Sequence, residues 1–166
     1  MFLLERVTPA SLMQSHQLRI FADYHQFYLR DEAAGGDLSD AWSQAAVERM
    51  LAVSDGVVGI CTVRDMDVPV TIEFLETEPA VDLASFDHVV EGSLVVSRGP
   101  LVVAGCTDPL PDAARLDLTP GSYRVRLSAS GFDTLSDDGL DGDDHYLVQL
   151  WPAPLIEPTV LKQGVV

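Results

Sequence analysis

Basic residues are scarce in this sequence. Its 166 residues include 10 lysines and arginines against 26 aspartates and glutamates, which gives a formal net charge of −16 at pH 7. A field of this sign repels a phosphate backbone, so the composition predicts no direct binding of nucleic acid. The same field attracts a basic protein surface and speeds the encounter at low salt. The alternative is that the acidic residues only confer solubility.

Cysteine is also scarce, and Cys61 and Cys106 lie inside apolar runs without C-x-x-C or histidine spacing. This argues against a disulfide framework and a zinc site, so we expect buried thiols, with a single disulfide as the alternative. The start, MFLLERVTPAS, lacks the apolar core of a signal peptide, and no run approaches the ~18 apolar residues of a membrane span. We therefore expect a cytoplasmic protein with no membrane association.

Catalytic motifs are absent as well. The sequence contains no P-loop, no dinucleotide fingerprint, no G-x-S-x-G turn and no metal-binding spacing among its four histidines. We therefore expect no enzymatic activity and no cofactor. His25 and His145 each lie near an acidic and an aromatic residue, which leaves open a hydrolase that uses one of them together with a carboxylate.

What the sequence has in quantity is β-strand signal. In SYRVRLSAS, residues 122–130, the apolar Tyr123, Val125, Leu127 and Ala129 alternate with polar residues, which is typical of a strand with one buried and one wet face. Further runs between turn signals, such as VPVTIEFLET and HYLVQLWPA, are rich in β-branched and aromatic residues. Seven or eight such strands predict a mainly β fold, an antiparallel β-sandwich.

One stretch departs from the strand pattern. LSDAWSQAAVERMLAVSDG carries apolar residues at three- and four-residue spacing, which predicts one short α-helix over about 40–52 that begins at Ser39 or Asp40 and stops at the Asp-Gly pair. No linker divides the chain. We therefore expect a single β-sandwich domain over 1–166, with an extended C-terminal arm from about residue 152.

The most acidic stretch, DTLSDDGLDGDD at residues 133–144, holds six aspartates and no basic residue. Oxygen-rich loops with glycine are what Ca²⁺ requires, and Asp137, Asp141 and Asp143 are the candidate ligands. The spacing, however, fits no EF-hand register and no G-G-x-G-x-D repeat. The other interpretations are a solvated loop between two strands and a charged recognition loop for a partner.

Aromatic residues give a second candidate surface. On an extended strand, Tyr24, Gln26 and Tyr28 share one face, and the residues between them share the other. Together with Phe27, Tyr146 and Trp151, these aromatics are candidates for a platform that binds a sugar or a peptide, or for anchors of a protein partner, although the two faces of the strand are not exposed together. The alternative is that they are buried in the sandwich core.

Several short stretches in order resemble the competence protein J family, whose members inhibit a DNA-entry nuclease. They are DYHQFYLRD, a Trp-containing helix with an S-D-G turn, LTPGSYRVRL and DDHYLVQLWPAP, spread over residues 20–155. The resemblance implies a small acidic β protein that binds and silences a nuclease. The acidic insertion at 133–144 and the C-terminal arm depart from the family pattern. The positions that carry the likeness are Tyr24, His25, Gln26, Phe27, Gly121 and Tyr123.

We therefore predict an acidic protein-binding module that inhibits a nuclease or another basic enzyme. The alternative is a calcium- or carbohydrate-binding β-sandwich. No pattern in the sequence indicates an oligomeric state. The residues predicted to bind the partner are Tyr24, Gln26, Tyr28, Asp137, Asp138, Asp141, Asp143, Asp144, Tyr146 and Trp151.

Overall fold

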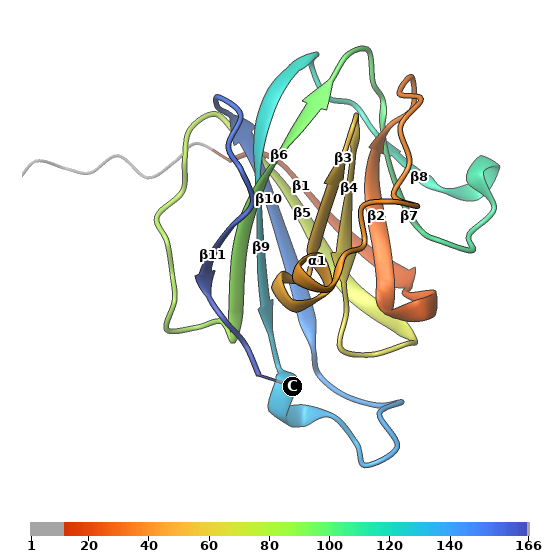
Figure 1. The fold of residues 1–166 in the computed structure, drawn as a ribbon, viewed down its shortest axis with the longest axis vertical. Helices are drawn as coiled ribbons and strands as arrows, with labels where there is room; N and C mark the ends of the chain where they lie inside the picture. Colours follow the sequence, from red (N-terminus) through yellow and green to blue (C-terminus); the bar gives the residue numbers. More distant parts are fainter. Residues whose placement is uncertain (1–11, 166) are drawn as a thin grey trace, which may run out of the picture.

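Two β-sheets form the protein, as the computed structural model shows for the residues it describes, 12–165 (Figure 1). The six-stranded sheet consists, in spatial order, of β1 (Leu12–Phe21), β5 (Asp67–Leu75), β10 (His145–Pro152), β9 (Gly121–Ser130), β6 (His88–Val96) and β11 (Thr159–Lys162). The five-stranded sheet consists of β3 (Leu51–Ser54), β4 (Val57–Cys61), β2 (Gln26–Asp31), β7 (Leu101–Gly105) and β8 (Ala114–Leu116).

The core contains apolar side chains from both sheets. Phe27 and Leu29 of β2 and Val125 and Leu127 of β9 are at most 1 % exposed. Among residues 12–165 there is one α-helix, α1 (Gln44–Arg49). The predicted mainly β fold, with two sheets and a single short helix, is confirmed.

One strand pair departs from the antiparallel prediction. The strand β10 pairs in parallel with β5, with Tyr146 beside Val70 and Leu150 beside Phe74. A parallel neighbour requires a long connection, and the chain between these two strands, which includes β6 to β9, supplies it. The alternation of apolar and polar residues along a strand cannot reveal the direction of its neighbour, because the alternation is the same in parallel and antiparallel pairs.

The helix is shorter than the predicted 40–52. It spans Gln44–Arg49, and the hydroxyl of Ser43 accepts a hydrogen bond of 3.1 Å from a first-turn N–H. Met50, with φ 63°, ends the helix in the left-handed region, and Leu51–Ser54 pairs with β4 as a strand. Pairing in the sheet therefore overrides the helical spacing of the sequence here.

The polar face predicted for β9 is buried, which corrects two expectations. Arg126 is 1 % exposed, and its Nε donates to Glu91 Oε2 at 2.7 Å while its Nη1 donates to the carbonyl of Pro79 at 3.0 Å. Its guanidinium lies 4.8 Å from the ring centroid of Trp151, which is 2 % exposed. The loop between β5 and β6 thus covers this face, and Trp151 is a core residue rather than a surface anchor.

The C-terminal segment continues past β10 as an extended arm. Arg124 Nη2 donates to the carbonyl of Pro154 at 3.0 Å, and the N–H of Ile156 donates to Ser93 Oγ at 2.9 Å. The arm then forms β11, which pairs antiparallel with β6.

Both cysteines are free thiols, so the disulfide alternative is wrong. Cys61 is half-buried, and burial raises the pKa of its thiol to about 11. Cys106 is exposed, contrary to expectation. Within residues 12–165, no helix is long and apolar enough to span a membrane.

A buried carboxylate joins the two sheets. Asp31, at the end of β2, is fully buried and accepts hydrogen bonds from the N–H of Ser97 at 2.7 Å, the hydroxyl of Ser97 at 2.6 Å, the N–H of Gly99 at 3.0 Å and the N–H of Ala33 at 3.1 Å. Burial alone would raise the pKa of Asp31, but these hydrogen bonds outweigh burial and lower it to about 2.

We expect Asp31→Asn to reduce the free energy of unfolding at pH 7 by about 2–3 kcal/mol, because the charge-assisted hydrogen bonds are lost. Since the folded-state pKa of Asp31 is depressed, its contribution is complete above about pH 4 and is lost as the pH falls toward about 2. Urea unfolding of both proteins at several pH values measures this. A stability difference that stays constant from pH 7 to about 2 would contradict the assignment.

Candidate functional site

The acidic stretch forms an ordered loop, residues 131–144, that connects β9 to β10 at one end of the six-stranded sheet (Figure 1). The loop begins at Gly131, whose φ of 80° favours glycine; a Cβ there would lie 2.5 Å from the carbonyl oxygen of Asp143. The hydroxyl of Thr134 accepts the N–H of Asp143 at 2.8 Å and donates to the carbonyl of Gly131 at 2.6 Å. These bonds close the base of the loop.

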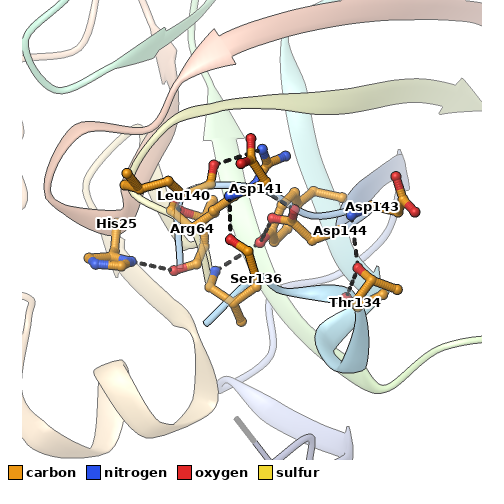
Figure 2. Close-up of polar contacts among 12 residues, drawn as sticks. His25, Arg64, Thr134, Ser136, Leu140, Asp141, Asp143 and Asp144 are labelled. Carbon is orange, nitrogen blue, oxygen red and sulfur yellow. Dashed lines mark hydrogen bonds and ion pairs between the residues drawn. The ribbon is translucent and has the colours of Figure 1, made fainter. Parts of the chain in front are cut away.

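A second set of hydrogen bonds orders its tip. Ser136 Oγ accepts the N–H of Asp141 at 2.9 Å (Figure 2). It also donates to Asp138 Oδ1 at 2.6 Å, which accepts the N–H of Leu140 at 3.0 Å as well. These bonds from Ser136 and Leu140 lower the pKa of Asp138 below its usual value. The segment is a solvated loop between two strands, as one interpretation of the sequence had it, and its hydrogen bonds give it a defined shape.

A buried ion pair anchors the loop to the sandwich. Arg64 Nε lies 2.7 Å from Asp144 Oδ1, and the two side chains are 8 % and 0 % exposed. The hydroxyl of Tyr146 donates to Asp144 Oδ2 at 2.8 Å and accepts the N–H of Val63 at 2.8 Å. Burial raises the pKa of Tyr146, with a further contribution from Asp144. Asp144 and Tyr146, predicted as partner-binding residues, are thus internal, because they satisfy Arg64 and the backbone.

The ion pair is connected to the turn between β1 and β2, the 3-10 helix η1 (Asp23–His25). Thr62 Oγ1 donates to the carbonyl of Arg64 at 2.7 Å, and His25 Nδ1 lies 3.2 Å from the carbonyl of Thr62. The N–H of Tyr24 lies 3.1 Å from Asp65 Oδ1. Residues 22–25, 62–67 and 131–144 therefore form one surface, which we call the acidic end (Figures 1 and 2).

Charge is concentrated at the acidic end. Its three segments hold nine aspartates and one arginine, Arg64, a formal charge of −8 and half of the −16 of the whole chain. Arg64 is neutralised internally by Asp144, so it offers no counter-charge to solvent. The five other aspartates of the loop are exposed: Asp133, Asp137, Asp138, Asp141 and Asp143.

Tyr24 presents an aromatic ring at the same end. Its side chain is 70 % exposed. Tyr24 and the following His25 both have positive φ, 57° and 59°, which costs energy for residues with a Cβ. The N–H of Tyr24 contacts Asp23 Oδ1 and Asp65 Oδ1, each at 3.1 Å, and so holds this conformation. Tyr24 is therefore in a turn and not on the strand face that the sequence suggested.

Two further residues predicted to bind the partner, Gln26 and Tyr28, lie away from the acidic loop. Gln26 and Tyr28 are half-buried on β2 and line a recess of about 200 Å³ together with Arg30 and Cys106, on a different surface from the acidic loop. With Tyr146 and Trp151 buried, no shared aromatic platform with Tyr28 forms, so the sugar-binding alternative loses its basis.

The described residues give the calcium interpretation no support. In the range 12–165, no three His, Cys, Asp or Glu side chains converge into a metal-binding group, so Asp137, Asp141 and Asp143 do not form the proposed site. His145, one of the two histidines considered for a hydrolase, has its Nε2 atom 2.9 Å from Thr71 Oγ1. Burial lowers the pKa of this half-buried histidine.

Sequence reasoning missed Arg64, Asp65 and Asp67 as parts of this surface. All three lie at the short connection between β4 and β5, far from the acidic loop in sequence. Their only sequence signal is VRDMD, a charged segment between two strands, and it does not indicate the loop it contacts.

Two solved structures share this fold. One is ComJ from Bacillus subtilis, described as an inhibitor of the DNA-degrading activity of NucA, with a TM-score of 0.61, 18 % identity and coverage of 88 % of this chain and all of ComJ. The other, described as crocagin biosynthetic gene J, has a TM-score of 0.53, 18 % identity and coverage of 89 % and 100 %. The chain has a ComJ-like fold. No protein-family model and no curated protein sequence matches it.

We expect Asp144→Asn to reduce the free energy of unfolding by about 3–5 kcal/mol, because it leaves the buried guanidinium of Arg64 without a counter-charge. Asp143→Asn is the matched control, since Asp143 is adjacent but exposed, and we expect it to stay within about 0.5 kcal/mol. Chemical denaturation measures both. Equal effects of the two substitutions would contradict the anchoring role.

Proposed function

We propose that this protein inhibits a nuclease by placing its acidic end against the basic surface that the nuclease uses for DNA. The observation that carries the proposal is the segregation of charge: half of the net charge lies on three short segments at one end, with its one arginine buried. A hydration coat would distribute carboxylates over the whole surface.

The order of the loop suits this role. Thr134, Ser136 and Asp138 fix the backbone, so the chain that carries Asp137, Asp141 and Asp143 does not have to be ordered on binding. Carboxylates placed where phosphates bind meet lysines and arginines that the nuclease already presents. Their field also accelerates the encounter at low salt.

Exposed ion pairs alone give little affinity, so a tight inhibitor also requires an anchor that becomes desolvated. Tyr24 supplies one, because its ring is exposed and its backbone is held by two carboxylates. A ring with few rotatable bonds loses little entropy on burial.

The structural comparison supports the same class of function. ComJ is described as an inhibitor of the nuclease NucA rather than as an enzyme, and its whole length aligns with this chain. Cytoplasm is the compartment that we propose, in keeping with two free thiols.

The first test neutralises the loop. We expect the triple substitution Asp137→Asn, Asp141→Asn and Asp143→Asn to weaken inhibition roughly ten-fold at low ionic strength, because three exposed charges each contribute about 0.5 kcal/mol. DNA cleavage by NucA, or by the nuclease encoded nearest to this chain, is measured with increasing amounts of protein. Rates are normalised to the uninhibited nuclease at each salt concentration.

The matched control removes three exposed carboxylates elsewhere, by Asp40→Asn, Asp117→Asn and Glu157→Gln. It changes the net charge equally, and we expect near-normal inhibition. The two triple variants should converge as salt is raised, because exposed charges are screened. Equal weakening by both variants at low salt would show that only overall charge matters, and unchanged cleavage at every ratio of wild-type protein would remove the inhibitor function.

The second test concerns the anchor. We expect Tyr24→Ala to weaken inhibition by about 2 kcal/mol, roughly 30-fold, with little dependence on salt. Tyr24→Phe keeps the ring and should retain most of the inhibition. A Tyr24→Ala protein that inhibits as well as wild type, with an unchanged melting temperature, would exclude Tyr24 from the interface.

A further inference from the structure

The strand β1 leaves a long sheet edge unpaired. Within residues 12–165 the two sheets end in four edge strands, of which β1 has ten residues, β3 and β11 four each, and β8 three. On one side β1 pairs with β5 along its length, and no other described strand pairs with it. Its opposite side therefore presents a row of backbone N–H and C=O groups that can accept another strand.

Two usual protections of an edge, proline and acidic side chains, are missing from β1, and its one register irregularity lies at the start of the strand, between Leu12 and Gln14. Natural edge strands are short, or carry proline or charged side chains that block pairing. The sequence of β1, LMQSHQLRIF, has no proline, no acidic residue and one charged residue, Arg19. Leu12, Met13 and Phe21 are 53 %, 59 % and 40 % exposed. In a chain of net charge −16, this edge is locally neutral to basic and partly apolar.

We propose that this edge pairs with the same edge of a second copy of the chain, antiparallel across a two-fold axis. Two strongly acidic molecules associate only if their carboxylates stay apart. The strand β1 has no acidic residue, so pairing of two β1 strands brings no carboxylates of these strands together. The strand ends at Phe21, directly before the acidic end, so antiparallel pairing places the two acidic ends at opposite limits of the joint sheet. The length of β1 separates them by roughly 34 Å, several times the ~8–10 Å screening length at physiological salt.

The two-fold axis restricts the register in which the two copies of β1 can pair. Residues directly opposite each other in an antiparallel sheet point to the same face, so the axis must pass through a residue that lies opposite its own copy. Centred on Gln17, the register places Ser15 opposite Arg19 of the second copy and Met13 opposite Phe21 of the second copy. No like charges then face each other, and the exposed apolar residues at the strand ends are covered. Pairing along the whole of β1 forms about ten main-chain hydrogen bonds, the number found at a standard interface.

The test follows the mass of the full chain by sedimentation over a range of protein concentration. We expect a monomer–dimer equilibrium with a Kd on the order of micromolar, because the contact is a strand edge and not a large apolar face. Hydrogen exchange should show amides of β1 that become protected as concentration rises. A monomer at every concentration, or a dimer without protection of β1, overturns the proposal.

Three variants locate the contact. Gln17→Lys places two ammonium groups against each other on the axis and should weaken the dimer at least ten-fold. Because Gln17 Oε1 accepts a hydrogen bond from the hydroxyl of Thr71 at 2.9 Å, Gln17→Met, which removes the same acceptor without adding charge, is the companion variant and should keep the dimer. Val160→Lys, on the short edge strand β11 of the same sheet, is the matched control and should leave the dimer intact. Loss of the dimer in Val160→Lys alone overturns the proposal, as does protection of β1 only after a target nuclease is added.

Discussion

The acidic end depends on the buried ion pair between Arg64 and Asp144. Arg64 comes from the loop between β4 and β5, Asp144 precedes β10, and Tyr146 joins them to the backbone of Val63. A buried pair of this kind adds little net stability compared with apolar residues, yet it is costly to break. It also removes the one arginine of this end from solvent, and among residues 12–165 none of the exposed aspartates there forms an ion pair. The Arg64–Asp144 pair therefore determines both the shape of the acidic end and its exposed negative charge.

Charge is distributed unequally over the rest of the molecule. The acidic end carries half of the net charge, while β1, immediately beside it in sequence, carries no acidic residue. Arg126 is paired with Glu91 and Glu78 beneath the loop that covers the outer face of the six-stranded sheet. Arg64 and Arg126 are therefore used inside the structure, while five of the six carboxylates of the acidic loop, all but Asp144, face solvent.

The strands were predictable from sequence because apolar and polar residues alternate along them, as in β9, where the apolar Tyr123 and Leu127 lie in the core. Burial of a polar side chain and the end of a helix were not predictable, because they depend on residues that are distant in the sequence. Arg126 lies on the predicted wet face and is buried, because Glu91 and the β5–β6 loop satisfy it. The helix was overestimated because β4 recruits Leu51–Ser54 into a sheet.

The acidic loop was recognised from sequence, but its anchor was not. Asp144 looks like its neighbours in a run of aspartates, and nothing in the run marks it as the one that is buried. Its partner Arg64 is distant in the chain, so the pair becomes visible only when the sandwich brings the two loops together.

The acidic loop leaves β9 and enters β10, which are antiparallel neighbours paired from Ser130 and His145 onward. Residues added to or removed from the loop between these positions leave every strand register unchanged. A scaffold with this connectivity can exchange this loop for one of different length or chemistry while the sandwich persists. Proteins that share the fold at 18 % identity are therefore free to differ in the length and charge of this loop without a change in strand pairing.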